Sequence, residues 1–122
     1  MFKSILFVGL GGGVGSIARY VLSYALNKVF DPFPFATFVI NVLGCFLIGI
    51  LYGMAFKNTW LEGNGGLLLA SGFCGGFTTF STFALENIKL FDKQLSITAI
   101  LYIAASIVVG LLLCRLGYLI AK

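Results

Sequence analysis

Residues 72–83 read GFCGGFTTFSTF and stand in the middle of an otherwise apolar segment. The stretch mixes glycines, hydroxyl side chains and phenyl rings. Gly75-Gly76 followed by Thr78-Thr79 disfavours a continuous helix at this point, because glycine is a poor helix former. A break would expose backbone carbonyls, which a membrane tolerates only where protein buries them or where they bind something.

The sequence around this stretch has the composition of a membrane protein. It is 60% hydrophobic and 10% charged, whereas soluble domains are about 45–50% apolar and about 25% charged. Uncharged runs cover 32–56, 63–85 and 94–114, and the run 4–27 is interrupted only by Arg19. Each run exceeds the roughly 20 residues that a helix needs to cross the hydrocarbon core.

We therefore predict an all-α membrane protein whose third transmembrane helix is broken in mid-membrane. A single domain over 1–122 is expected, with spans at about 4–27, 33–56, 63–88 and 95–118. Connections are expected near 28–33, 57–62 and 89–94, which leave no room for a soluble catalytic domain. A cleaved signal peptide is the alternative for the first run, since Lys3 precedes it and Ser16-Ile17-Ala18 resembles a processing site. The apolar run resumes after Arg19, which favours a span.

The polar composition excludes several functions. The chain has no histidine and few acids, so it lacks the usual groups for metal-assisted or histidine-based catalysis, and we predict that it is not an enzyme. The three cysteines lie in different apolar runs without CxxC spacing, which predicts free, buried thiols: Cys45, Cys74 and Cys114. The net charge of +4 lies mainly at span ends. It indicates contact with anionic lipid headgroups rather than with nucleic acid.

The distribution of basic residues gives little preference for one orientation in the membrane. With four spans, one side carries Lys3, Lys57, Arg115 and Lys122, and the other carries Lys28, Lys89 and Lys93. Because the positive-inside rule needs an imbalance, we predict insertion in both orientations. Dual insertion of so small a protomer favours an antiparallel homodimer with its two-fold axis in the membrane plane.

Glycine pairs with a spacing of four predict close helix packing. They are Gly9/Gly13, Gly11/Gly15, Gly49/Gly53 and Gly72/Gly76. Such spacings let helix backbones approach closely in lipid. Packing within one subunit and packing between subunits are both open at this point.

Several polar residues in the apolar runs require partners or a function. Arg19 either snorkels from a helix end or has a structural or electrostatic role beside an anion path. Asn41, with Thr37 one turn away on the same face, either joins two helices or offers a hydrogen-bond donor to a water-filled or ion-filled path. Tyr102 and Ser106 place two hydroxyl groups on one face of the last span.

The rings of the 72–83 stretch have two interpretations. If the segment is helical, Thr78, Ser81 and Thr82 share one face while Phe80 and Phe83 lie on the opposite one. The rings either face lipid or the core, or present their positive edges to an anion. Backbone carbonyls turned inward at a two-fold axis would suit a small hard cation.

Three stretches together resemble a known family. Residues 12–20 (GGVGSIARY), 37–46 (TFVINVLGCF) and 72–83 resemble the signatures of the CrcB/Fluc fluoride channel family, in the family's order and spacing. The resemblance covers the whole chain. It implies a dual-topology homodimer in the bacterial inner membrane with two antiparallel pores. These pores would let fluoride leave the cytoplasm passively and so lower its toxicity.

The resemblance also implies functional residues. Phe80 and Phe83 would be paired rings lining the fluoride path, and Asn41 would contact the ion. A polar track would include Thr37, Ser81, Thr82, Tyr102 and Ser106. A structural sodium ion would be held at the dimer axis by the backbone carbonyls of Gly75 and Thr78. Arg19 and Glu86 would be vestibule or structural charges, and Cys45 departs from the serine that is frequent in the family.

Two other functions were considered. A small dual-topology multidrug or cation exporter has a similar length, but coupled export needs a membrane-buried carboxylate. The first span has Arg19 and no acid, and Glu86 is expected at the edge of its span. An assembly subunit without transport would explain the glycine spacings but would leave Asn41 and residues 78–83 unexplained.

Overall fold

The computed structural model describes residues 1–27 and 32–122. Throughout these residues the chain forms helices and no strand. Four helical segments of the described chain are long and apolar enough to cross a membrane: Phe2–Leu26, Phe35–Ala55, Asn64–Asp92 and Ser96–Ala121. The prediction of an all-α membrane protein with four spanning segments is therefore confirmed.

Three of the four segments are single helices: α1 (Phe2–Leu26), α2 (Phe35–Ala55) and α7 (Ser96–Ala121). The third is composite. It runs through α4 (Asn64–Gly66), the π-helix η1 (Leu67–Cys74), α5 (Gly75–Phe77) and α6 (Phe80–Asp92). A π-helix of this length is rare, and π-helical turns occur frequently at functional sites.

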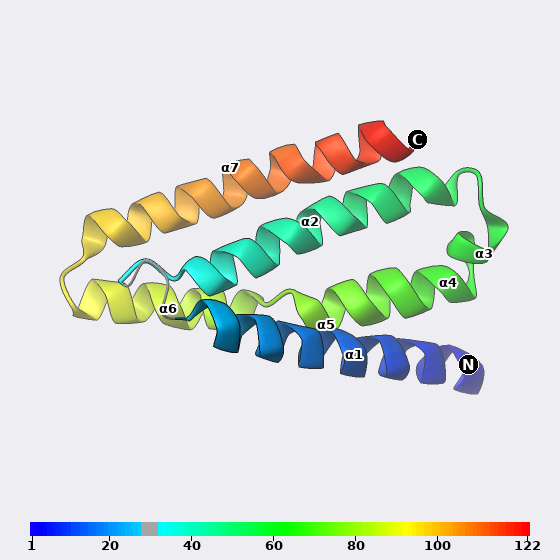
Figure 1. Ribbon diagram of the computed structural model, residues 1–122, viewed down its shortest axis with the longest axis horizontal. Helices are drawn as coiled ribbons and strands as arrows, with labels where there is room; N and C mark the ends of the chain where they lie inside the picture. The colour runs from blue at the N-terminus through cyan, green and yellow to red at the C-terminus, as the bar shows by residue number, and fades with distance from the viewer. Residues whose placement is uncertain (28–31) are drawn as a thin grey trace.

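The composite segment changes its neighbours along its length. Helix α2 packs mainly along α7, while α1 packs along η1 and α5 and α6 packs against α7 (Figure 1). The composite segment thus joins two helix pairs, and the passage from one to the other coincides with the short gap between α5 and α6. Both termini lie at the same end of the molecule, as an even number of spans requires (Figure 1).

Glycines allow these helices to touch through their backbones. A Cβ atom on Gly11 or Gly15 of α1 would overlap the backbone of Leu68 or Phe73. On the α2–α7 side, a Cβ on Gly117 would overlap the carbonyl of Phe46. Close approach of this kind increases van der Waals contact, which is the main attraction between helices in lipid.

The remaining glycines with this spacing fall into two groups, packed and open. Gly49, Gly53, Gly72 and Gly76 also lie against neighbouring backbone, so these pairs serve packing within the protomer. Gly9 and Gly13 differ from them, because a Cβ on either would meet nothing within 4 Å. This face of α1 is open in the described protomer.

The connection after α2 contains a short capped helix, α3 (Thr59–Glu62). The side chain of Asn58 caps it by accepting hydrogen bonds from the backbone N–H groups of Trp60 and Leu61 at 3.0 and 3.3 Å. The Trp60 indole lies over Gly65 so closely that a Cβ there would collide with it, yet Trp60 remains 50% exposed.

The connection expected near 89–94 is shorter in the structure. Helix α6 continues through Asp92, so only the next few residues connect it to α7, and Gln94 takes a positive φ of 60° in this turn. The expectation rested on the charges of Lys89 and Lys93, but helix ends in membranes accommodate lysines that extend to the interface. The connection expected at 28–33 and the charge of Lys28 lie largely outside the described residues, since 28–31 are not among them.

Candidate functional site

The helix of the third segment is interrupted at two threonines. Helix α5 ends at Phe77, Thr78 (φ −83°, ψ 159°) and Thr79 (φ −150°, ψ 121°) are extended, and α6 begins at Phe80. Gly75 and Gly76, where the sequence also suggested a break, are helical. Because Thr78 precedes α6, the expectation that it shares a helical face with Ser81 and Thr82 is wrong.

Thr79 starts the helix that follows the interruption. Its Oγ1 accepts a hydrogen bond from the backbone N–H of Thr82 at 3.2 Å, which makes Thr79 the N-cap of α6. Sequence reasoning did not assign Thr79 a role. The available signal was its residue type, because threonine is a preferred N-cap directly before a helix.

Asn41 of α2 holds the interruption from across the helix interface. Its Nδ2 donates to the carbonyl of Thr79 at 3.0 Å, and its Oδ1 accepts from the N–H of Thr79 at 2.9 Å. The Asn41 amide thus gives Thr79 the N–H donor and the carbonyl acceptor that a neighbouring backbone would otherwise supply. An asparagine amide has two N–H donors, so one donor of Asn41 is not needed by Thr79.

The interruption deprives several backbone carbonyls of their usual helix donors, and those of Gly75 and Thr78 are two of them. In a continuous helix the N–H of Thr79 would reach the carbonyl of Gly75, and the N–H of Thr82 would reach that of Thr78. Asn41 and the Thr79 hydroxyl take these two N–H groups instead. The two carbonyls that lose these donors are those that the resemblance assigned to a sodium ion, and unwound carbonyls of this kind suit such an ion.

Arg19 of α1 supports the last turn before the interruption. Its Nε donates to the carbonyl of Gly76 at 3.1 Å, and the hydroxyl of Ser16 lies 3.5 Å from the same oxygen. In a continuous helix this carbonyl would accept from Phe80. Arg19 therefore has an acceptor inside the protein, and a cation is favourable near the last carbonyls of a helix.

A second polar cluster surrounds Glu86. Thr37 of α2 donates its hydroxyl to Oε2 of Glu86 at 3.0 Å, and Tyr102 of α7 donates to Oε1 at 3.0 Å. The side chain of Tyr102 is 0% exposed. The sequence placed Glu86 at a span edge, whereas the structure places it between three helices. Thr37 and Asn41, one turn apart on α2, thus have different partners.

The phenyl rings form a continuous aromatic contact with Tyr102. The centroids of Phe80 and Phe83 are 5.7 Å apart with an interplanar angle of 36°, and those of Phe83 and Tyr102 are 5.0 Å apart at 55°. Phe80 is 79% exposed. A second ring pair, Phe73 and Phe77, is stacked at 5.5 Å and 13° on the other side of the interruption.

The remaining hydroxyls of the expected polar track are separated from one another. Ser81 is exposed, and its Oγ lies 3.4 Å from the hydroxyl of Thr79. The Oγ of Ser106 is buried and has no hydrogen-bond partner in the described part of the chain. For Thr82 the structure gives a backbone contact to Thr79, and no side-chain bond is recorded.

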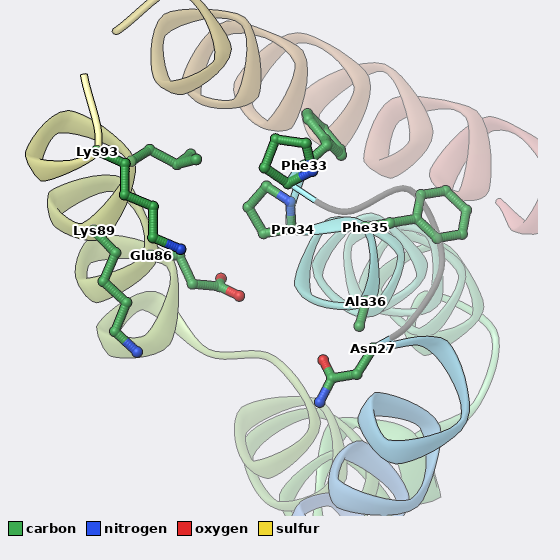
Figure 2. Close-up of a pocket in the computed structure, with 10 residues that line it drawn as sticks. Asn27, Phe33, Pro34, Phe35, Ala36, Glu86, Lys89 and Lys93 are labelled. Atoms are coloured by element: carbon green, nitrogen blue, oxygen red, sulfur yellow. The ribbon is translucent and has the colours of Figure 1, made fainter. Parts of the chain in front are cut away.

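Two cavities border these groups. One of about 420 Å³ opens beside the interruption and is lined by Asn41, Gly75, Thr78, Thr79 and Phe80 among others. The other, of about 200 Å³, opens at the ends of α1 and α6, and Figure 2 shows the Glu86 carboxylate pointing into it. Within 1–27 and 32–122, no group of three or more His, Cys, Asp and Glu could hold a metal ion.

These features define a class: a small multi-pass membrane protein in which polar side chains converge on a helix interruption. The model of the family described as "CrcB-like protein, Camphor Resistance (CrcB)" matches residues 6–118. The chain belongs to this family, which confirms the resemblance of its three signatures.

Relatives of the chain carry one name. A protein of Azobacteroides pseudotrichonymphae genomovar. CFP2 is 46% identical over 100% of this chain and 98% of its own length. Proteins of Flavobacterium psychrophilum and Chlorobaculum tepidum are 43% and 45% identical, over 98% and 100% of this chain and 98% and 97% of their own lengths. Each of the three is named "Fluoride-specific ion channel FluC".

Proposed function

We propose that this protein is a passive, selective fluoride channel of the bacterial inner membrane that exports fluoride and lowers its toxicity. The observation that carries this proposal is near full-length identity of 43–46% to three proteins named as fluoride-specific ion channels. No observation favours the alternative of a multidrug or cation exporter. Both oxygens of Glu86, the carboxylate such an exporter would use, accept hydrogen bonds from neighbouring side chains.

The polar groups of the third segment suit the physical problem of moving a small anion. Removing such an ion from water costs tens of kcal/mol by Born-type reasoning unless donors replace its hydration. A path needs many weak donors in series, so that the ion enters and still leaves. The second N–H of Asn41, the edges of the Phe80 and Phe83 rings, and hydroxyl groups provide this series. In the proposed track the hydroxyls belong to Thr37, Ser81, Thr82, Tyr102 and Ser106. Those of Thr37 and Tyr102 donate to Glu86 in the protomer, so they would donate to an ion only after leaving this carboxylate.

An antiparallel homodimer with two pores completes the proposal. Phe80 is largely exposed in the protomer, and the cavity beside it is open. A second copy packed on this side would enclose both, with the interruption lying inside the membrane. The nearly equal numbers of basic residues on the two sides support the antiparallel orientation.

A sodium ion fits two of the freed carbonyls. Gly75 and Thr78 each offer an oxygen that is relieved of its usual helix donor, and a two-fold axis would double this number. Such an ion would supply positive charge that holds the two interruptions together. In this role it stabilises the interface and does not drive transport.

The test is fluoride release from liposomes that contain the purified protein and are loaded with potassium fluoride. Valinomycin lets potassium leave, and an ion-selective electrode records the external fluoride. A matched sample loaded with potassium chloride tests selectivity. We expect rapid release of fluoride, little release of chloride, and no requirement for a proton gradient.

Two outcomes would contradict the proposal. Absence of fluoride release from a folded protein, with size-exclusion chromatography showing the assembled form, would exclude a channel. Release of chloride at the same rate as fluoride would exclude a fluoride-selective one.

A further inference from the structure

The cavity of about 200 Å³ at the ends of α1 and α6 has an unusual charge. Among the described residues, its charged lining consists of one carboxylate, Glu86, and two ammonium groups, Lys89 and Lys93. Figure 2 shows Glu86 and Lys89 of α6 and Lys93 directly after it, with Asn27 at the end of α1 and Pro34 directly before α2 across the space. We call Asn27, Glu86, Lys89 and Lys93 the lysine mouth.

The two lysines make no direct contact with a carboxylate of the described residues, although Lys89 lies close enough to Glu86 to attract it electrostatically. Lys89 lies in the last turn of α6, and Lys93 directly follows the last helical residue, Asp92. In the described ranges, neither ammonium group makes a hydrogen bond or ion pair. The oxygens of Glu86 accept from Thr37 and Tyr102 instead. The charged lining of the mouth is therefore positive by one unit, with both cations open to the cavity.

The lysine mouth adjoins the proposed pathway through a shared residue. Glu86 lines the mouth and also accepts the hydroxyl of Tyr102 at 3.0 Å. The ring of Tyr102 contacts that of Phe83, whose centroid is 5.0 Å away, and Phe83 contacts Phe80. An anion that reaches the mouth is thus beside the polar cluster that leads to the rings.

We propose that the lysine mouth collects anions at one end of the pathway and offsets the repulsion of the Glu86 carboxylate. This inference rests on the proposed channel function. A cleft lined by one sign of charge raises the local concentration of the opposite ion and its rate of entry. The effect depends on the sign of the charge and not on which halide is present. The mouth therefore raises the rate at which anions pass, while selectivity for fluoride arises deeper in the protein.

The test uses salt to separate electrostatics from structure. Fluoride release is measured for the Lys89→Gln/Lys93→Gln variant at constant fluoride, at ionic strengths of about 10 mM and about 300 mM set with potassium isethionate. The screening length falls from about 30 Å to less than about 8 Å between these conditions. Vesicles of phosphatidylcholine and phosphatidylethanolamine alone remove anionic headgroups as an alternative partner for the lysines.

We expect flux through the variant to be roughly threefold to tenfold lower at low salt, near the lower end of the range for charge-focused entry. The difference disappears at high salt, and exclusion of chloride is unchanged at both. Lys89→Arg/Lys93→Arg, which keeps both charges, retains the flux of the unmodified protein. Lys57→Gln is the matched control, because it removes an exposed lysine outside the mouth.

Three outcomes would overturn the inference. Equal flux at low salt would show that the lysines do not attract the permeating ion. A loss that persists at high salt, or that the arginine variant shares, would indicate a structural role. Absence of flux from the unmodified protein would exclude the channel function itself, and so is distinguished from a failure of the mouth alone.

Discussion

The α2–α7 pair and the junction of α5 with α6 satisfy their backbone polar groups in different ways. In lipid, each backbone polar group without a partner costs several kcal/mol. Helices α2 and α7 satisfy these groups internally, and glycines such as Gly117 bring their backbones together. At the junction, side chains satisfy the backbone: the amide of Asn41, the hydroxyl of Thr79 and the guanidinium of Arg19.

This difference separates stability from function. Where α2 and α7 touch through glycines such as Gly117, the contact is one of backbone with backbone, and its value to the protein is packing. An interruption leaves donors and acceptors inside the apolar region, and it persists only because specific side chains hold it. Substitutions in the two regions should therefore produce different kinds of defect.

The largest effect is expected from Asn41→Ala. The substitution leaves the N–H and the carbonyl of Thr79 without partners, at roughly 1–3 kcal/mol each. We expect fluoride flux to fall about tenfold or more, since 1.4 kcal/mol corresponds to a factor of ten. Liposome flux and a thermal unfolding midpoint in detergent measure the two consequences. Leu43→Ala, at an exposed position on the same helix, is the control, and wild-type flux in Asn41→Ala would show that the interruption persists without the amide.

An intermediate effect is expected from Phe83→Ile and from Phe80→Ile. Isoleucine keeps an apolar side chain but removes the positive ring edge and the ring contacts with the neighbouring aromatic side chains. Aromatic pairs are worth about 0.5–1.5 kcal/mol, so flux should fall roughly threefold to tenfold. The oligomeric state should be unchanged by size-exclusion chromatography. Phe73→Ile, in the stacked ring pair before the interruption, is the matched control. An equal loss in the control would mean that the rings act through packing.

The smallest effect on flux is expected from Gly117→Ala. Its new methyl group overlaps the Phe46 carbonyl, and overpacking of this kind costs about 1–3 kcal/mol of stability. Flux for each folded assembly should stay within about twofold of the unmodified protein, since α2 and α7 keep their polar groups. Chemical denaturation in detergent and flux normalised to folded protein are the measurements.

Gly13→Ala is the control for this prediction, because a Cβ there meets nothing within 4 Å in the protomer. Its free energy of unfolding should change by no more than about 0.5 kcal/mol. A larger loss of unfolding free energy in Gly13→Ala than in Gly117→Ala would mean that the surroundings of Gly13 are tighter than the α2–α7 contact at Gly117.

The sequence predicts the four spans well, because hydrocarbon thickness sets their length and few charges interrupt them. The sequence predicts the surroundings of Glu86 less well. The charge itself ended the uncharged run at 85, although α6 continues through Asp92 and carries Glu86 inward. The partners Thr37 and Tyr102 depend on the relative depth of three helices, which residue types alone do not specify.

The position of the interruption illustrates a second limit. Glycine pairs suggested a break at 75–76, but Gly76 is helical and lies against the backbone of Gly12 of α1. Its lack of a side chain therefore serves close packing and not chain flexibility. The helix ends at Phe77, just before the two threonines, where Thr79 can cap the next helix and Asn41 can accept its N–H. A glycine can serve close packing or chain flexibility, and only its neighbours in the fold show which of the two applies.

The contact of Trp60 with Gly65 has a practical consequence. Trp60 is the single tryptophan of the chain, and its half-exposed indole rests on the glycine backbone near the end that carries both termini. Indoles favour the headgroup region of a bilayer. The protein thus contains one native fluorophore at a defined height, and quenching by lipids brominated at different acyl positions would measure the immersion depth of this end without any added dye.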